Sequence, residues 1–143
     1  MTQTTQTTPG RRIVPRPSLF SRPFWQAARR HELVFQHCNK CGHNILYPRY
    51  NCIHCGSTDL GWRKASGKGT VYSFTVARRP THPAFVEMTP FVIAIVDLEE
   101  GVRMTSNIIG CKPEEVRVGM PVEATFEDVN EEVALVMFRP ASS

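Results

Sequence analysis

The chain has 143 residues, of which 41% are hydrophobic and 21% charged, a balance typical of a globular protein with one modest core. It lacks a run of eighteen apolar residues, which excludes a bilayer-spanning helix, and its Thr- and Gln-rich start lacks the apolar segment of a secretory signal. We therefore expect a cytoplasmic protein, and the formal net charge of +4 does not by itself indicate a nucleic-acid ligand.

The first twenty residues are expected to form an extended or disordered arm. Residues 1–20 contain Pro9, Gly10, Pro15 and Pro17 among scattered Thr and Arg residues. Prolines and polar residues at this density oppose regular structure and supply little apolar surface. The arm should therefore contribute little to the core.

A short amphipathic helix is predicted within residues 21–35. Ser21 is a suitable N-cap, and Pro23 suits the first helical turn because the N–H that proline lacks would be unpaired there in any case. No later residue breaks the pattern, so we expect the helix to run to about Leu33.

The helix should carry an aromatic pair, Phe24 and Trp25. Phe24, Ala28 and Phe35 are predicted to lie roughly on one apolar face. The pair either covers a neighbouring barrel or docks on another protein, since aromatic anchors are common at the centres of interfaces. The sequence pattern of the helix does not distinguish between these two roles.

Residues 36–65 are expected to form a metal-stabilised ribbon. Four of the five cysteines occur in two Cys-x-x-Cys-Gly segments, with ten residues between Cys41 and Cys52, in a stretch with few apolar residues. The spacing lets both sulfurs of a pair face one ion, and the glycine readily adopts the positive φ that the turn needs. Four sulfurs leave no open position, so the predicted zinc is structural. Its predicted ligands are Cys38, Cys41, Cys52 and Cys55.

Two alternatives to this site stay open. Iron could take the same four sulfurs, as in rubredoxin. One of His37, His43 and His54 could replace a sulfur, although four sulfurs already complete a tetrahedron. Cys111 has no partner motif and is expected to pack at a strand end. With zinc and four thiolates, the net charge falls from +4 to about +2.

The remaining segment, 66–143, predicts a mainly β domain. Runs rich in β-branched and aromatic residues alternate with turn signals, including Glu99-Glu100-Gly101 and residues 129–132. A single helical turn is expected within residues 112–118. Five antiparallel strands with a small helix between the third and fourth are the layout of an OB-fold, a closed Greek-key barrel. The predicted strands are 69–78, 91–98, 102–109, 121–128 and 133–139.

A basic, proline-rich loop is expected between the first two of these strands. It begins at Arg78 and Arg79 and ends near Pro90. Long loops on small barrels are often functional, and arginines bind phosphates well, so the pair could bind a nucleotide-like ligand; a solvated flexible loop is the alternative.

Catalytic motifs are missing from the sequence. It contains no G-x-S-x-G elbow, no H-E-x-x-H and no phosphate loop. The segment Gly67-Lys68-Gly69-Thr70 lacks the upstream glycine and strand of a phosphate loop. We expect it to form a hairpin or the start of a strand.

Several separated motifs resemble a known family. They are Phe24-Trp25 in a leading helix, the two cysteine pairs with Tyr47-Pro48-Arg49 between them, residues 66–75, and Phe138-Arg139-Pro140 near the end. Over about 21–140 the chain is similar to small proteins with a rubredoxin-like zinc ribbon followed by an OB-fold, which accompany thiolase-superfamily enzymes. Ile53 departs from the proline common in the second knuckle and leaves the zinc prediction intact.

The resemblance implies a non-catalytic accessory subunit. Family members accompany thiolases, hydroxymethylglutaryl-CoA synthases, lipid-transfer-type thiolases and the aldolases that cleave acyl-CoA side chains of steroids. The implied role is to stabilise the partner in a hetero-oligomer and to help form its acyl-CoA channel, while the nucleophile and bases belong to the partner. Arg78 and Arg79 would suit the phosphates of CoA, and Phe24 and Trp25 are the candidate partner contacts.

Two other functions compete with this interpretation. Single-stranded nucleic acid is a possible ligand, because zinc ribbons and OB-folds both occur in proteins that bind it. The low corrected charge and modest aromatic content of the predicted strands oppose that function. A free-standing acyl-CoA carrier would need an internal pocket, whereas a five-stranded barrel is usually filled by its own side chains.

Overall fold

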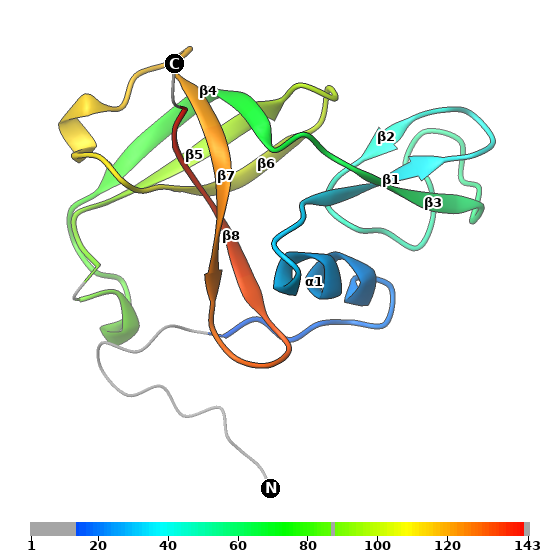
Figure 1. Cartoon of the computed structure of the whole chain (residues 1–143), viewed down its shortest axis with the longest axis horizontal. Helices are drawn as coiled ribbons and strands as arrows, with labels where there is room; N and C mark the ends of the chain where they lie inside the picture. Colours follow the sequence, from blue (N-terminus) through cyan, green and yellow to red (C-terminus); the bar gives the residue numbers. More distant parts are fainter. Residues whose placement is uncertain (1–13, 87, 142–143) are drawn as a thin grey trace, which may run out of the picture.

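The computed structural model describes residues 14–86 and 88–141. A helix, a three-stranded sheet and a closed five-stranded barrel follow in chain order, with the small sheet and the barrel at opposite ends of the long axis (Figure 1). The mainly β fold with an N-terminal helix, a ribbon and a five-stranded OB-type barrel is confirmed. Within the described ranges, none of the helices has the length and apolar character needed to cross a membrane.

The start of helix α1 (Arg22–Arg29) agrees with the prediction. Pro23 lies in the first turn, and Ser21 is the N-cap residue. The Ser21 side chain, however, makes no capping hydrogen bond, because its hydroxyl accepts the backbone N–H of Ser18 at 2.8 Å. Most of the expected arm, residues 1–20, lies outside the described residues, and 14–20 contain no helix or strand.

The predicted end of the helix is wrong. The helix stops at Arg29 and not near Leu33, and His31 turns the chain with a φ of 62°. The last two residues of the expected 21–35 helix instead begin strand β1 (Val34–Cys38), whose first three residues are all buried. These residues pair with a strand some 26 positions later in the chain. Burial on both faces of a strand outweighs local helix propensity here, and no local pattern signals such a distant partner.

The ribbon is a small antiparallel sheet that the sequence did not predict as strands. Strand β1 lies at its centre, between β2 (Asn44–Ile45) and β3 (Leu60–Lys64). The strands are two to five residues long, and their apolar residues do not alternate clearly. These strands are defined by the hydrogen bonds between them and not by an alternation of apolar and polar side chains.

The barrel closes in the order β4-β5-β6-β8-β7, with β7 returning to β4. Four of the five pairings are antiparallel, but β6 and β8 run parallel, so the expectation of five antiparallel strands is wrong in one pairing. A closed ring with an odd number of strands cannot alternate direction throughout, which makes one parallel pair unavoidable. The barrel strands are β4 (Lys68–Ala77), β5 (Phe91–Leu98), β6 (Arg103–Ile108), β7 (Pro121–Asp128) and β8 (Ala134–Pro140).

Short 3₁₀ turns complete the connections. One, Pro113–Glu115, lies between β6 and β7 where a single helical turn was predicted, and the other, Pro83–Phe85, lies in the β4–β5 loop. The segment Gly67-Lys68-Gly69-Thr70 leads into β4, which confirms the expected strand entry.

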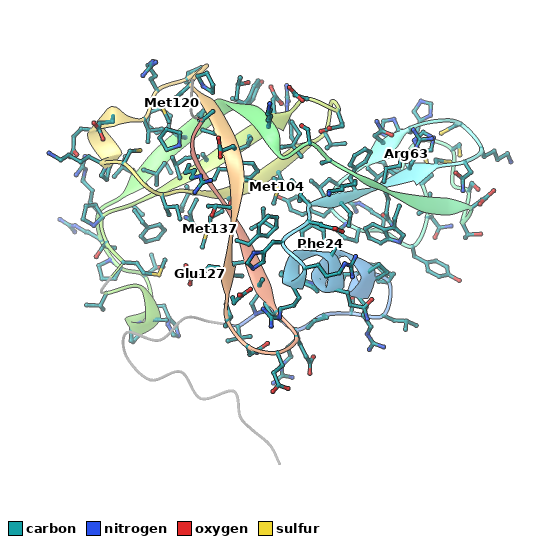
Figure 2. The ribbon with its side chains drawn as sticks, viewed as in Figure 1. Phe24, Arg63, Met104, Met120, Glu127 and Met137 are labelled. Carbon is teal, nitrogen blue, oxygen red and sulfur yellow. The ribbon has the colours of Figure 1, made fainter. Side chains whose placement is uncertain are left out.

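One apolar core joins the barrel to the helix. Phe24 and Ala28 of α1 belong to the same buried cluster as the barrel interior, where Phe138 and Val96 are fully buried. At the helix end, the Arg29 guanidinium lies 2.6 Å from the Asp128 carboxylate on β7. The helix is therefore packed against the barrel wall, which places Phe24 in the middle of the molecule (Figure 2).

Gly69 gives a test of the barrel wall. A Cβ at this position would lie 2.4 Å from the carbonyl oxygen of Asp97 on β5. We expect Gly69→Ala to lower the free energy of unfolding by about 1–3 kcal/mol, because backbone must move to relieve the contact. The matched control is Gly61→Ala, whose Cβ would meet the Asn39 side chain at 3.4 Å. Urea unfolding of both variants measures the difference, and equal stability would contradict the close-packed wall.

Candidate functional site

The four predicted metal ligands converge within the ribbon. All four Sγ atoms lie within 4.8 Å of one another, with 3.5 Å between Cys38 and Cys55 and 3.7 Å between Cys41 and Cys52. A tetrahedral zinc ion with bonds of about 2.3 Å needs sulfurs about 3.8 Å apart. The spacing of the sulfurs therefore fits one zinc ion.

The two cysteine pairs have the same local geometry. The carbonyl oxygen of Cys38 accepts the N–H of Gly42 at 2.8 Å, and that of Cys52 accepts the N–H of Gly56 at 2.9 Å. Both glycines have φ near +80°, the left-handed region that the spacing predicted. In each pair the backbone N–H of the second cysteine points at the first sulfur, 3.4 Å away.

These N–H groups shift the thiol pKa values. The N–H of Cys41 is the largest influence on Cys38 and helps lower the pKa of that thiol to about 6. The pKa of Cys41 is instead raised to about 12. The His43 N–H, its largest single influence, lowers it, but burial and the neighbouring thiols together outweigh that effect. If all four thiols lost their protons, four negative charges would lie within 4.8 Å of one another and would need a cation. The four-sulfur donor set fits a divalent metal.

The three nearby histidines do not join the sulfur cluster. The rings of His43 and His54 stack on each other with centroids 5.2 Å apart, and His37 Nδ1 lies 2.7 Å from Asn44 Oδ1. In the part of the chain that the structure describes, the cysteines form the cluster without a histidine. The assignment of the four cysteines as zinc ligands stays a prediction.

The ribbon has almost no apolar core of its own. Its buried cluster contains Cys38, Ile45 and Cys52, with Leu60 packed beside them. A cluster of this size supplies too little hydrophobic stabilisation for an independent unit. Metal binding would therefore supply much of the free energy that orders the ribbon.

Metal analysis tests this site directly. We expect close to one zinc per chain, with four sulfurs at about 2.3 Å by X-ray absorption. Cys55→Ser should release the metal and expose the ribbon to proteolysis while the barrel resists, whereas Cys111→Ser should keep the metal. A nitrogen bound directly to the metal would show that a histidine is one of the ligands. Bound iron would show that the metal is not zinc.

An apolar groove of about 460 Å³ lies where the helix, the ribbon and the barrel meet. Figure 2 labels Phe24, Met104 and Met137, which come from α1, β6 and β8 and line it. None of the twelve lining residues is charged. They are Ser21, Phe24, Trp25, Tyr47, Pro48, Met104, Thr105, Ser106, Asn107, Leu135, Val136 and Met137.

Polar contacts fix the ribbon wall of this groove. The buried Gln36 side chain donates to the carbonyl of Arg49 at 2.9 Å and accepts the N–H of Arg49 at 2.6 Å. Its amide group thus pairs with the Arg49 main chain as the backbone of an adjacent strand would. This clamp holds the loop that carries Tyr47 and Pro48. The Tyr47 hydroxyl then accepts the backbone N–H of Thr105 on β6. The sequence offered no signal for the groove, since its lining comes from three distant segments.

The other predicted site residues lie apart. Phe24 is only 7% exposed and packs edge-on against Trp25, so of the candidate contact pair Trp25 is the more accessible. Arg78 and Arg79 are exposed just after β4 and form no ion pair with a described residue. Cys111 is partly buried against the barrel core, as expected for a packing residue.

Two domain families match the chain. A domain described as "ChsH2, rubredoxin-like zinc ribbon domain" matches residues 25–61, and "ChsH2, C-terminal OB-fold domain" matches residues 62–127. In structure, the chain resembles one in "Ltp2-ChsH2(DUF35) aldolase", with a TM-score of 0.80, 38% identity, and coverage of 90% of this chain and 100% of that one. A DUF35 protein of unknown function from Sulfolobus solfataricus, 16% identical with a TM-score of 0.62, shares the fold.

Named relatives are of two lengths. A "DUF35 domain-containing scaffold protein" of Methanocaldococcus jannaschii is 36% identical over 124 residues, 86% of this chain and 87% of that protein. A "Probable enoyl-CoA hydratase alpha subunit" of Thermomonospora curvata is 43% identical over 129 residues, 89% of this chain, but this chain spans only 40% of its length. These matches confirm the expected resemblance, and the chain belongs to the ChsH2-type DUF35 family, in which a rubredoxin-like zinc ribbon precedes an OB-fold.

Proposed function

We propose that this chain is a non-catalytic accessory subunit that binds a thiolase-superfamily enzyme, stabilises it and helps to form its acyl-CoA channel. The observation that carries the proposal is the likeness, over 90% of this chain, to the chain solved in "Ltp2-ChsH2(DUF35) aldolase". The scaffold names of the archaeal relatives support the same role. Hydratase names occur among relatives that are much longer than this chain.

The chemistry of the described site supports an accessory role. Four cysteine sulfurs would complete the coordination of a zinc ion, which leaves no position for water or substrate. The barrel interior is filled by its own side chains, among them Val71, Val96, Val122 and Phe138. An acyl chain would therefore bind at a shared surface and not inside the barrel.

The β4–β5 loop supports a contact with CoA. Arg78 and Arg79 are exposed and have no carboxylate partner among the described residues, and guanidinium groups bind phosphate oxygens well. We assign them to the phosphates of an acyl-CoA at the site shared with the enzyme subunit.

A nucleic-acid function finds less support. Tyr72 is the exposed aromatic residue on the barrel strands within the described ranges, and the Arg103 guanidinium covers its ring at 3.8 Å. Arg103 is itself paired with Asp97. A binder of single strands needs free aromatic faces along a basic groove, and this barrel face offers neither.

Complex formation tests the proposal. The full chain alone should not turn over any acyl-CoA, whereas with its thiolase-superfamily subunit it should form a stable complex that is more active or more soluble than that subunit alone. Trp25→Ala should weaken assembly by about 2 kcal/mol, roughly thirtyfold, because buried aromatic anchors dominate interface energies. Tyr72→Ala, an exposed aromatic outside the groove, is the control. Turnover by the isolated chain would refute the proposal.

Kinetics of the complex test the loop arginines. Arg78→Ala and Arg79→Ala should raise the KM for acyl-CoA without dissociating the complex, because each removes a phosphate partner. Arg63→Ala, an exposed arginine of the ribbon, should leave KM unchanged. An unchanged KM in the double variant would remove the loop from the CoA site.

A further inference from the structure

Strand β6 leaves most of one edge without a neighbouring strand. The N–H of Leu98 donates to Val102 at 2.8 Å, which sets the β5–β6 register so that Met104 and Ser106 exchange hydrogen bonds with β5. The main-chain groups of Arg103 and Thr105 therefore point away from β5. On that side β8 pairs with β6 at a single bridge, Ile108 with Phe138.

Side-chain hydroxyls occupy the gap where the two strands diverge. The Ser106 hydroxyl donates to the carbonyl of Val136 on β8 at 2.6 Å. The Tyr47 hydroxyl, from the ribbon, accepts the N–H of Thr105. The main-chain N–H and C=O of Arg103 and the C=O of Thr105 have no hydrogen-bond partner among the described residues, so this part of the edge can pair with an extended peptide.

The groove beside this edge selects an uncharged, apolar occupant. Its twelve lining residues carry no cation for a phosphate and no carboxylate for a basic group. Two methionines, Met104 and Met137, supply adaptable apolar surface beside Leu135. An extended polypeptide matches both features, because its main chain pairs with the strand edge and its side chains fill the groove.

We propose that this groove receives an extended, uncharged apolar segment of the enzyme subunit, which lies along β6 and pairs with the open main-chain groups of Arg103 and Thr105, while Tyr47 and Pro48 of the ribbon bound one end of the groove. The proposal rests on the proposed accessory function and adds the place and the chemistry of the contact. Because the Gln36 clamp and the sulfur cluster both order the ribbon, removal of metal should weaken docking even while the barrel stays folded.

Paired substitutions in the full chain test the groove, with the enzyme subunit that co-purifies with the wild-type chain as the probe. Leu135→Glu should weaken the complex at least tenfold, whereas Ile95→Glu, at a 37% exposed position of β5 outside the groove, should change it less than twofold. Tyr47→Ala should weaken it, whereas Tyr50→Ala, at a 69% exposed position of the same loop, should not. Thermal melts establish that each variant is folded.

Hydrogen exchange in the unmodified chain gives an independent measurement. Within residues 103–107, the amides of Arg103 and Thr105, which point away from β5, should exchange at least tenfold more slowly in the complex than in the free chain, whereas those of Met104 and Ser106 already bond to β5 and should change less. Chelation of the metal should reverse the difference by releasing the enzyme subunit. A benzophenone side chain at position 135 should crosslink to an uncharged apolar segment of that subunit, while one at position 53 should not.

The outcomes separate the two proposals. If the wild-type chain binds no enzyme subunit, the accessory function fails and the groove assignment with it. If the complex forms but Leu135→Glu binds like wild type and exchange at 103–107 is unchanged, the groove assignment alone is wrong. Binding of octanoyl-CoA in the groove of the free chain, without a crosslink to the enzyme subunit, would identify a substrate pocket and also overturn it.

Discussion

A ring of five strands must contain one parallel pair. The attachment of the helix and the ribbon, and the apolar groove between them, follow from where that pair lies. In this chain the pair is β6 and β8, which meet at one bridge and then diverge. Hydroxyls of Ser106 and Tyr47 bond to main-chain groups in the gap between them, and Phe24 and Trp25 of helix α1 line the groove beside it. The seam of the barrel is therefore where the helix and the ribbon are attached, and it forms the floor of the apolar groove.

The ribbon needs separate interactions for its order and its orientation. Its own apolar cluster is small, so we expect order to depend on an ion bound by the four sulfurs. Orientation depends on polar contacts with the β5–β6 hairpin. Asn44 Nδ2 donates to the carbonyl of Glu100 at 3.2 Å, and the N–H and hydroxyl of Ser66 donate at 2.8 Å to the carboxylates of Glu100 and Glu99. A structural metal at one end can thereby influence a groove wall at the other.

Two places on the surface fit the two tasks of the proposed accessory subunit. The groove is neutral and apolar, which suits a protein segment, whereas the loop at Arg78 and Arg79 is cationic and exposed, which suits phosphates. Both surfaces fit the proposed accessory role, in which the reactive groups belong to the enzyme subunit.

Local spacing in the sequence determined the cysteine knuckles and the five barrel strands, because Cys-x-x-Cys-Gly turns and period-two alternation are properties of a few adjacent residues. The end of the helix, strand β1 and the burial of Phe24 depended on partners far along the chain, which no local pattern contains. The parallel seam followed from ring closure, a property of the whole barrel. Only the tertiary structure brought Trp25, Tyr47 and Leu135 to one groove, because each lies on an element whose position is set by packing against the others.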